Sequence, residues 1–498
     1  MSYLLGIDLG TTGVKVIAMD TAGKTAGEAT EEYPLLTPRP GWAEQNPSEW
    51  WEAVKKSVRK MLRTSGINPS GIKGIGLTGQ MHGAVFLDKN NSVIHPAILW
   101  CDQRTVKECA EIIERAGEER IFEITANPVL TGFQAPKILW LRKNFPSLYA
   151  RVSKVLLPKD YIRFLLTGVF ATDVSDASGT SLLDVGKRRW SGEILGKLGI
   201  PEDFLPECFE SVEITGKITG KAAEETGLKK GTPVAAGAGD QAAGGIGSGV
   251  VEKGLISVSL GTSGVVFGHS EKVFADREKR LHAFCHAVPG KWHLMGVMLS
   301  AGGSFRWLRD NLLMEPYEAM AGMAKTVPEG SEGLIFLPYL AGERCPHPDP
   351  NARGIFFGLS LKHSREHIAR AVMEGILFGL KDILNIMKAS GISPCRKLRV
   401  SGGGARSDFW CAMMADIFNA RIARLSSGEG PSYGAAIIAG IGTGIYSDAA
   451  SACRLLVKEK DVFVPEEKRA AVYEKFYGLY KNLYPSVKAQ FDILGKIV

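Results

Sequence analysis

The chain has 498 residues, which is enough for two domains that each bury a hydrophobic core. Hydrophobic residues make up 45% of it and charged residues 23%, ordinary globular values that exclude a largely disordered chain. The net charge of +7 is a small difference between 60 basic and 53 acidic residues, and the densest basic run, GKRRW at residues 186–190, is short, so we expect no nucleic-acid partner.

The N-terminal segment alternates strand patterns with turn residues and then enters a helix. Strands are predicted at residues 3–10, 12–20 and 27–35, where apolar residues are bounded by turn residues. Asn46 and Pro47 suit the start of an amphipathic helix over residues 46–66. A further strand follows at residues 72–80. This order predicts an α/β unit in which an antiparallel start joins a parallel core.

One peptide occurs almost twice. Residues 7–16 read IDLGTTGVKV, and about half a chain later residues 258–267 read VSLGTSGVVF. A period this long excludes a solenoid, whose units have roughly 20–50 residues. We therefore predict two copies of one α/β domain, residues 1–249 and 250–498. No low-complexity linker separates the copies, so they are expected to pack closely around a central cleft.

Both copies of the peptide suit phosphate oxygens, because glycines in a tight turn let backbone N–H groups form a concave anion site. Only the first copy carries Asp8, which suits a magnesium ion, and Lys15, which would offset phosphate charge. The alternative is that each loop is only a hairpin turn and that Asp8 caps it. The presence of two equivalent copies favours a nucleotide clamp.

A second phosphate motif is rejected. Residues 18–25, AMDTAGKT, resemble a relaxed P-loop. A P-loop needs a helix directly after its Lys, so that the helix N-terminus faces the phosphates. A strand-like pattern containing Pro34 follows instead. We predict a hairpin turn over residues 20–24.

Two strand ends carry residues that suit a polyhydroxylated ligand. Met81 and His82 follow one strand, and Trp100, Asp102 and Arg104 follow another. An apolar flank with directional hydrogen-bonding groups is typical of a small-molecule site. Taken singly, each of these residues is better explained by a structural role.

Asp240 is the candidate general base. It follows a short apolar strand and a Gly-rich turn, at the start of a small-residue helix. At that position it suits a helix N-cap, which is the structural alternative. A helix N-terminus also favours the carboxylate form, and phosphoryl transfer to an alcohol needs an acceptor for the hydroxyl proton.

Two glycine-rich stretches lie in the second half. Residues 400–410, VSGGGARSDFW, form a strand-to-helix turn whose backbone suits a base or ribose, or alternatively a close strand–helix contact. Residues 430–447 are uncharged, but five glycines make them a poor bilayer span. We predict a packed core helix there and no membrane partner. Other helices are expected at 365–389, 407–419 and 468–491.

The cysteines and histidines do not predict a disulfide framework or a zinc site. Eight cysteines are scattered without a C-x-x-C pair, and the N-terminus has no basic signal-peptide region, so a cytoplasmic protein is expected. The one metal-like cluster lacks the paired thiols of a zinc site and lies in a strand-like pattern. It comprises His282, Cys285, His286 and His293.

These motifs, in this order and over essentially the whole chain, resemble the FGGY family of carbohydrate kinases. GIDLGTTGVK and SLGTSG resemble the family's two phosphate loops, and GGGARSDFW its adenosine motif. Residues 338–359, followed by 367–375, are similar to its C-terminal signature. The resemblance implies two actin-like, ribonuclease H-like ATPase domains, with ATP and Mg²⁺ as cofactors. It also suggests a homodimer.

The resemblance also implies site roles. Glycerol kinases have an Arg-Glu pair where this chain has Met81-His82, and the GQMHG form is similar to members that phosphorylate the 5-hydroxyl of D-xylulose. Asp240 matches the catalytic base and Asp8 the catalytic and metal-organising carboxylate. The implied sugar contacts are Met81, His82, Trp100, Asp102, Asp240 and Gln241. The implied nucleotide contacts are Thr11, Thr12, Lys15, Gly261, Thr262, Gly302, Arg306, Gly403, Gly404 and Asp408.

Four positions depart from the pattern of the D-xylulose kinases. They are Cys101, Gln134, Gln241 and Cys345. They leave the kinase prediction intact and keep other sugars or polyols open as substrates, including ribulose, gluconate and glycerol. A non-catalytic sugar sensor or an actin-like ATPase is the remaining alternative, and Asp240 within a complete set of loops argues against it.

Overall fold

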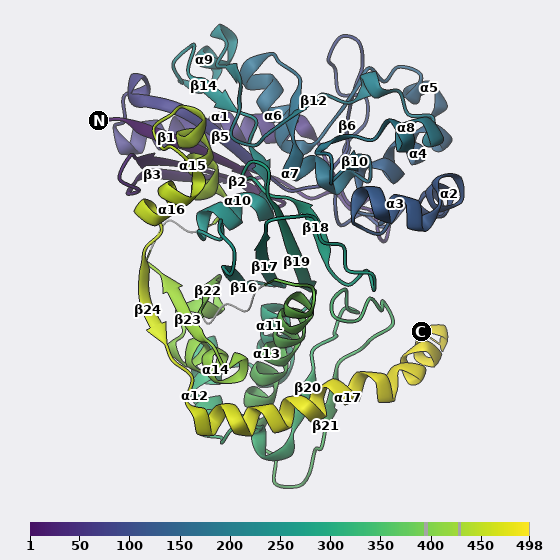
Figure 1. The fold of residues 1–498 in the computed structure, drawn as a ribbon, viewed down its shortest axis with the longest axis vertical. Helices are drawn as coiled ribbons and strands as arrows, with labels where there is room; N and C mark the ends of the chain where they lie inside the picture. Colours follow the sequence, from purple (N-terminus) through teal and green to yellow (C-terminus); the bar gives the residue numbers. More distant parts are fainter. Residues whose placement is uncertain (393–396, 427–429, 498) are drawn as a thin grey trace.

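The structure, a computed structural model, describes residues 1–392, 397–426 and 430–497. Within that range the chain forms two lobes, each built around a seven-stranded sheet (Figure 1). The first sheet has the order β13(Ile214–Lys217), β14(Pro233–Ala235), β5(Ile72–Gly79), β1(Tyr3–Leu9), β2(Gly13–Asp20), β3(Thr25–Glu32), and β15(Ala238–Gly239) also pairs with β5. The second sheet has the order β18(His282–Cys285), β19(Trp292–Met298), β17(Gly264–Ser270), β16(Ile256–Leu260), β22(Lys397–Ser401), β23(Arg421–Leu425), β24(Glu459–Phe463).

The two sheets repeat one arrangement. In the first, β1 pairs antiparallel with β2 and parallel with β5. In the second, β16 pairs antiparallel with β17 and parallel with β22. The two Gly-Thr peptides therefore form equivalent hairpin turns, β1–β2 and β16–β17, as the repeat predicted. The boundary expected after residue 249 falls between α10(Asp240–Gly247) and β16.

Helices and short ribbons complete the lobes. The helices of the first half are α1(Pro47–Ser65), α2(Val106–Ala116), α3(Glu118–Thr125), α4(Gln134–Asn144), α5(Pro146–Tyr149), α6(Pro158–Thr167), α7(Val174–Ala177), α8(Gly192–Leu198) and α9(Gly220–Thr226). Those of the second half are α11(Gly302–Leu308), α12(Tyr317–Lys325), α13(Arg365–Ala389), α14(Asp408–Phe418), α15(Pro431–Gly442), α16(Ala449–Leu456) and α17(Glu467–Ile497). Two-stranded ribbons pair β4(Glu44–Gln45) with β7(Ala97–Ile98), β6(Val85–Leu87) with β8(Lys154–Leu156), β9(Ala171–Asp173) with β12(Glu207–Phe209), β10(Leu183–Asp184) with β11(Arg189–Trp190), and β20(Ile335–Leu337) with β21(Ile355–Phe357).

Helix α15 belongs to the second half of the chain but packs in the first lobe. It lies on β1, β5 and α10, as Figure 1 shows by its place beside the N-terminal strands. The contact is so close that a Cβ at Gly6 or Gly76 would lie 1.9 Å from a carbonyl oxygen of α15. The predicted core helix is thus confirmed, although its position in the other lobe was not predicted. Among the described residues, no helix is both long and apolar enough to cross a bilayer.

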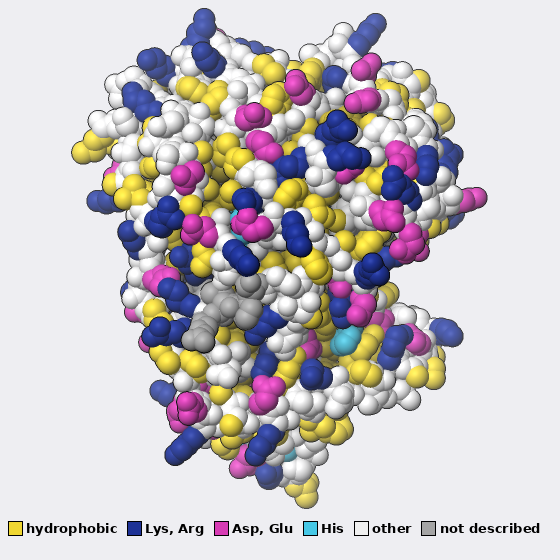
Figure 2. Space-filling model, viewed as in Figure 1, with side chains coloured by type: hydrophobic (Ala, Val, Ile, Leu, Met, Phe, Trp, Pro, Cys, Tyr) yellow, Lys and Arg dark blue, Asp and Glu magenta, His cyan; other side chains and the backbone are white. Residues whose placement is uncertain are grey.

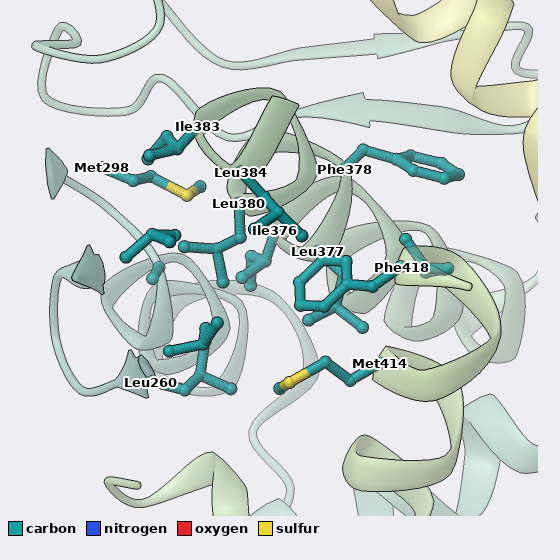
Figure 3. Packing of buried hydrophobic residues seen from close by; sticks show 14 of the residues in the cluster. Leu260, Met298, Ile376, Leu377, Phe378, Leu380, Ile383, Leu384, Met414 and Phe418 are labelled. Atoms are coloured by element: carbon teal, nitrogen blue, oxygen red, sulfur yellow. The ribbon is translucent and has the colours of Figure 1, made fainter. Parts of the chain in front are cut away.

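The core of the second lobe surrounds α13. Figure 3 shows Ile376, Leu380 and Leu384 of this helix lying among side chains from neighbouring elements, such as Leu260 and Met298. The helix has the bounds that its pattern predicted, residues 365–389. Because Leu260 ends β16, the same core fixes the strand that leads into the second Gly-Thr loop.

The basic run at residues 186–190 forms the turn of the β10–β11 ribbon. Arg188 there pairs with Glu210 at 2.6 Å and donates to the carbonyl of Lys291 at 2.7 Å. On the face in Figure 2, basic and acidic side chains are interspersed rather than gathered by sign. Arg188 is largely buried, whereas Lys187 and Arg189 of the same run are exposed.

Candidate active site

Three side chains outside the first Gly-Thr loop donate hydrogen bonds to Gly10 and Thr11 of this loop. Gly10 closes the turn by donating its N–H to the Gly13 carbonyl at 3.0 Å. Tyr33 donates its hydroxyl to the Gly10 carbonyl, and Gln45 donates to the Thr11 carbonyl at 2.7 Å. Trp100, one of the predicted sugar contacts, donates its indole N–H to the Thr11 hydroxyl at 3.0 Å. The loop is therefore preorganised.

The two charged residues proposed for this loop differ in their surroundings. Lys15 lies opposite Asp8 on the neighbouring strand and is exposed, and its ammonium pairs with Glu28 at 3.1 Å. Thr12 is also exposed at the tip of the turn. Neither side chain is buried in the protein, so both remain available to a ligand.

The second Gly-Thr loop is supported by the start of α11. Gly302 donates its N–H to the Gly261 carbonyl at 2.9 Å, and Gly303 donates to the Thr262 carbonyl at 2.9 Å. A Cβ at Gly302 would lie only 2.4 Å from the Gly261 oxygen. Gly302 was predicted to contact nucleotide, and the structure gives it a packing role on the phosphate loop. Arg306, on the same helix, is exposed.

The triple glycine after β22 combines packing with an open backbone. A Cβ at Gly402 would lie 2.6 Å from the Leu260 carbonyl oxygen, and one at Gly404 would lie 2.0 Å from the Leu260 side chain. A Cβ at Gly403 would meet no atom of the described residues within 4 Å. Gly403 is therefore the glycine whose backbone a base or ribose can approach. Asp408, at the start of α14, is exposed and pairs with Arg424.

Asp8 and Asp240 lie at the ends of two strands, β1 and β15, that both pair with β5. Strands β1 and β15 both run parallel to β5, and Asp8 and Ala238 share the register partner Thr78. Burial, together with the charge of Asp240, raises the pKa of Asp8 to about 7 against the opposing charge of Lys15. One oxygen of the Asp8 carboxylate is buried with no hydrogen-bond partner among the described residues.

Asp240 is the first residue of α10 rather than its cap. Gly239 occupies the N-cap position, and no side-chain cap bond forms at this helix start within the described chain. The capping interpretation of Asp240 is therefore wrong. Burial raises its pKa to about 6, while hydrogen bonds from the backbone and side chain of Gln241 oppose the shift. Such a carboxylate is ionised at neutral pH and still basic enough to take a proton.

Met81 lies beside Asp240 and between the lobes. A Cβ on Gly239 would lie 2.9 Å from the Met81 side chain, so the two strand ends touch. Met81 also belongs to a small apolar cluster with Phe133 of the first half and with Phe284 and Met295 of the second. The loop that carries the predicted sugar contacts Met81 and His82, called the sugar loop below, is thus covered by strands β18 and β19 of the second lobe.

His82 has a defined tautomer. Its Nδ1 lies 2.8 Å from the carbonyl oxygen of Gly179, and because a carbonyl only accepts, Nδ1 carries the proton. Burial, with the nearby charge of Lys137, lowers its pKa well below the usual value, so the ring is neutral. The second ring nitrogen, Nε2, is consequently a hydrogen-bond acceptor.

Lys137 is a site residue that the sequence did not reveal. Its ammonium is fully buried in α4 and donates to the carbonyls of His82 at 2.8 Å and Gly132 at 2.5 Å. Burial lowers its pKa to about 7. The only feature of the sequence that could have indicated its burial is its place within the mostly apolar residues 133–141. Its neighbour Gln134, one of the four departures, is buried and donates to the carbonyls of Gly83 and Leu156.

Asp102 has a structural role, contrary to its predicted sugar contact. Its buried carboxylate accepts the N–H of Ala43 at Oδ2 at 2.7 Å, and Arg104 donates from Nε to Oδ1 at 2.9 Å and from Nη2 to Oδ2 at 2.7 Å. Both oxygens are therefore occupied. Trp100 is 37% exposed, so its ring keeps a free surface. The other two departures, Cys101 and Cys345, are free thiols.

The residues of the histidine and cysteine cluster make packing and backbone contacts. Its residues lie on or beside β18 and β19, where His282 stacks on Phe284 and His286 contacts the Val250 carbonyl at 2.9 Å. Among the residues that the structure describes, no group of three His, Cys, Asp or Glu side chains is arranged to hold a metal ion.

Comparison with known families agrees with this geometry. The N-terminal domain of the FGGY family of carbohydrate kinases matches residues 3–247, and its C-terminal domain matches residues 256–443. The chain belongs to the FGGY family of carbohydrate kinases. The predicted α/β fold with two actin-like domains is confirmed by its solved neighbours.

Individual relatives cover the whole chain. A xylulose kinase of Lactococcus lactis is 42% identical over 488 residues, which are 97% of each chain. The ligand-bound xylulose kinase of Lactobacillus acidophilus has a TM-score of 0.94 and 28% identity, with all of both chains covered. A gluconate kinase from the same organism has a TM-score of 0.93 and also 28% identity over all of both chains. The backbone alone does not separate these two activities.

Proposed function

We propose that the protein is a xylulose kinase that transfers the γ-phosphate of ATP to the 5-hydroxyl of D-xylulose, giving D-xylulose 5-phosphate and ADP. The observation that carries this proposal is the contact of Met81 with the start of the Asp240 helix, in a chain 42% identical to a xylulose kinase over its full length. The sugar loop and the candidate base thus form one site.

Asp240 acts as the general base. The 5-oxygen attacks the γ-phosphorus, and the new O–P bond forms as the bond from that phosphorus to ADP breaks. The hydroxyl proton passes to the Asp240 carboxylate, which is ionised at neutral pH because its pKa is about 6. A positioned base contributes about 10²–10⁴-fold to such a step.

The phosphates of ATP lie between the two Gly-Thr loops. The exposed hydroxyls of Thr12 and Thr262 and the loop N–H groups are the donors, and Lys15 adds positive charge. Arg306, Gly403, Gly404 and Asp408 lie around the nucleotide. Because hydrogen bonds already hold both loops, ATP binding should cost little conformational entropy in them.

Asp8 fits a magnesium ion. One oxygen of its buried carboxylate has no hydrogen-bond partner among the described residues, and a divalent cation would compensate the charge of that carboxylate. Mg²⁺ bound there would offset charge on the phosphates, and it takes few protein ligands when phosphates supply the rest. Asp8 therefore holds negative charge next to the nucleotide and leaves Asp240 free for the proton.

The sugar contacts follow from donor and acceptor roles. Met81 supplies an apolar surface, His82 accepts a hydrogen bond from a sugar hydroxyl at Nε2, and Gln241 offers both donor and acceptor atoms. Trp100 presents its ring while its N–H holds the phosphate loop. Asp102 is left out because Arg104 and Ala43 occupy it.

The test is ATP turnover with a panel of acceptors. A coupled ADP assay compares D-xylulose, D-ribulose, L-ribulose, gluconate and glycerol. We expect kcat/KM for D-xylulose to exceed every other value by at least about tenfold, the discrimination that one well-placed polar contact provides. A higher kcat/KM for gluconate than for D-xylulose would overturn the choice of sugar. Gluconate is included because the gluconate kinase is as similar in backbone as the xylulose kinase from the same organism. No turnover with any acceptor would favour a non-catalytic sensor.

We further propose a cytoplasmic homodimer. The seven cysteines that the structure describes are all free, as a reducing compartment favours. Light scattering on the purified protein tests the assembly, since a monomer and a dimer differ twofold in mass.

A further inference from the structure

Behind the end of β15 lies a buried charge cluster that the proposed reaction does not use. The ammonium of Lys159 lies 2.5 Å from Asp160, 2.9 Å from Asp173 and 3.5 Å from Asp176. All four side chains are 0% exposed. Removing a cation and three carboxylates from water is costly, and apolar packing of the same volume is often more stable. The stability of the fold therefore gives no reason for this cluster.

A chain of hydrogen bonds connects this cluster to the candidate base. One oxygen of Asp173 pairs with Lys159, and the other accepts the hydroxyl of Ser175 at 2.5 Å and its N–H at 2.8 Å. Ser175 in turn accepts the N–H of Gly239 at 3.1 Å. Gly239 directly precedes Asp240, so the chain runs unbroken from Lys159 to the backbone of the base.

The donor and acceptor roles in these hydrogen bonds fix the orientation of the Ser175 hydroxyl. Ser175 has a single hydroxyl proton, which it donates to Asp173, so the lone pairs of Ser175 face the N–H of Gly239. Lys159 supports the neighbouring strand as well, since a Cβ at Gly79 would lie 3.4 Å from the Lys159 Cβ. Gly79 and Gly239 are register partners on β5 and β15. The cluster thus lies beneath both strand ends that lead to Met81 and Asp240.

We propose that Lys159, Asp173 and Ser175 are positioning residues that fix the end of β15, so that the Asp240 carboxylate meets the sugar hydroxyl in reacting geometry. This inference rests on Asp240 acting as the base. A misplacement of about 1 Å at a reacting group can cost about 10²-fold in rate. Loss of the Ser175 hydroxyl frees the Gly239 N–H and loosens the first turn of the base's helix.

The test compares Ser175→Ala with Ser211→Ala. Ser211 donates to the same Asp173 oxygen at 2.8 Å and is equally buried, but no bond joins its hydroxyl to Gly239 among the described contacts. The chemical step is measured by rapid quench in single turnover, because product release can limit kcat. KM for sugar and ATP and the thermal midpoint are measured for both variants.

We expect Ser175→Ala to slow the chemical step at least tenfold with both KM values within threefold, and Ser211→Ala to stay within threefold of wild type. Equal rates in the two variants, or a Ser175→Ala effect confined to KM, overturn the inference. If Ser175→Ala does not fold, Asp173→Asn is measured, and the same loss of rate at unchanged KM is expected. Asp240→Asn separates the two proposals: residual activity above a tenth of wild type refutes the base assignment, whatever Ser175 shows.

Discussion

Asp8 and Asp240 end two strands that share the neighbour β5, and the charge of Asp240 raises the pKa of Asp8. Two buried carboxylates at this proximity are costly to ionise together unless a cation or donors compensate them. Gln241 compensates Asp240, whereas Asp8 has an oxygen without a partner among the described residues. This difference supports the proposed roles, which are proton transfer for Asp240 and cation binding for Asp8.

Asp8→Asn should damage turnover far more than Ser259→Ala, the change at the equivalent position of the second loop. We expect a loss of about 10²-fold in kcat/KM for ATP, the usual cost of removing one electrostatic contact in a transition state. Ser259→Ala should stay within threefold. A coupled ADP assay at saturating Mg²⁺ measures both variants, and similar losses in the two would contradict the asymmetry of the loops.

The pH dependence of kcat/KM for the sugar should report the base. Below about pH 6 Asp240 binds a proton and cannot accept another, so kcat/KM should fall tenfold per pH unit. Gln241→Ala keeps the backbone hydrogen bond to Asp240 but removes the side-chain hydrogen bond, which lowers the pKa of Asp240, so the acid limb should move to higher pH. An acid limb that moves down, or does not move, in Gln241→Ala would count against this assignment.

Lys137→Met should change how stability depends on pH. The folded pKa of Lys137 is about 7, below the value of about 10.4 in an unfolded chain. Between these values the unfolded state binds more protons, so the free energy of unfolding of the wild type rises with pH, by about 1.4 kcal/mol per unit. Lys137→Met lacks this rise. Unfolding by urea at pH 7, 8 and 9 measures the free energy of unfolding of both proteins. If the difference between wild type and Lys137→Met does not change with pH, the lowered pKa of Lys137 is refuted.

Gly6→Ala and Gly76→Ala should destabilise the first lobe strongly. The added methyl group would lie 1.9 Å from a backbone carbonyl of α15, which cannot move without displacing the helix. We expect a loss of about 3 kcal/mol or more. Gly196→Ala is the control, since a Cβ there meets nothing described within 4 Å, and it should stabilise α8 by about 0.5–1 kcal/mol. Thermal midpoints that rank otherwise would contradict the close packing of α15.

The features that could be predicted from sequence are those set by local pattern. The bounds of α13 and the turns at Gly10 and Gly261 follow from periodicity and from glycines in a repeated peptide. Asp102 could not be assigned, because its partner Ala43 is 59 residues away in the chain. Lys137 was missed for a similar reason, since its acceptor at His82 becomes visible only when α4 packs beneath the sugar loop.

The placement of α15 also bears on how the molecule can be divided. A fragment ending at residue 249 would leave the α15-facing side of β1, β5 and α10 bare, and the remaining fragment would carry an apolar helix with no sheet to cover. Neither piece is a self-sufficient folding unit, despite the repeat in the sequence. Separately expressed halves are therefore expected to aggregate alone and to reconstitute the enzyme only when they are refolded together.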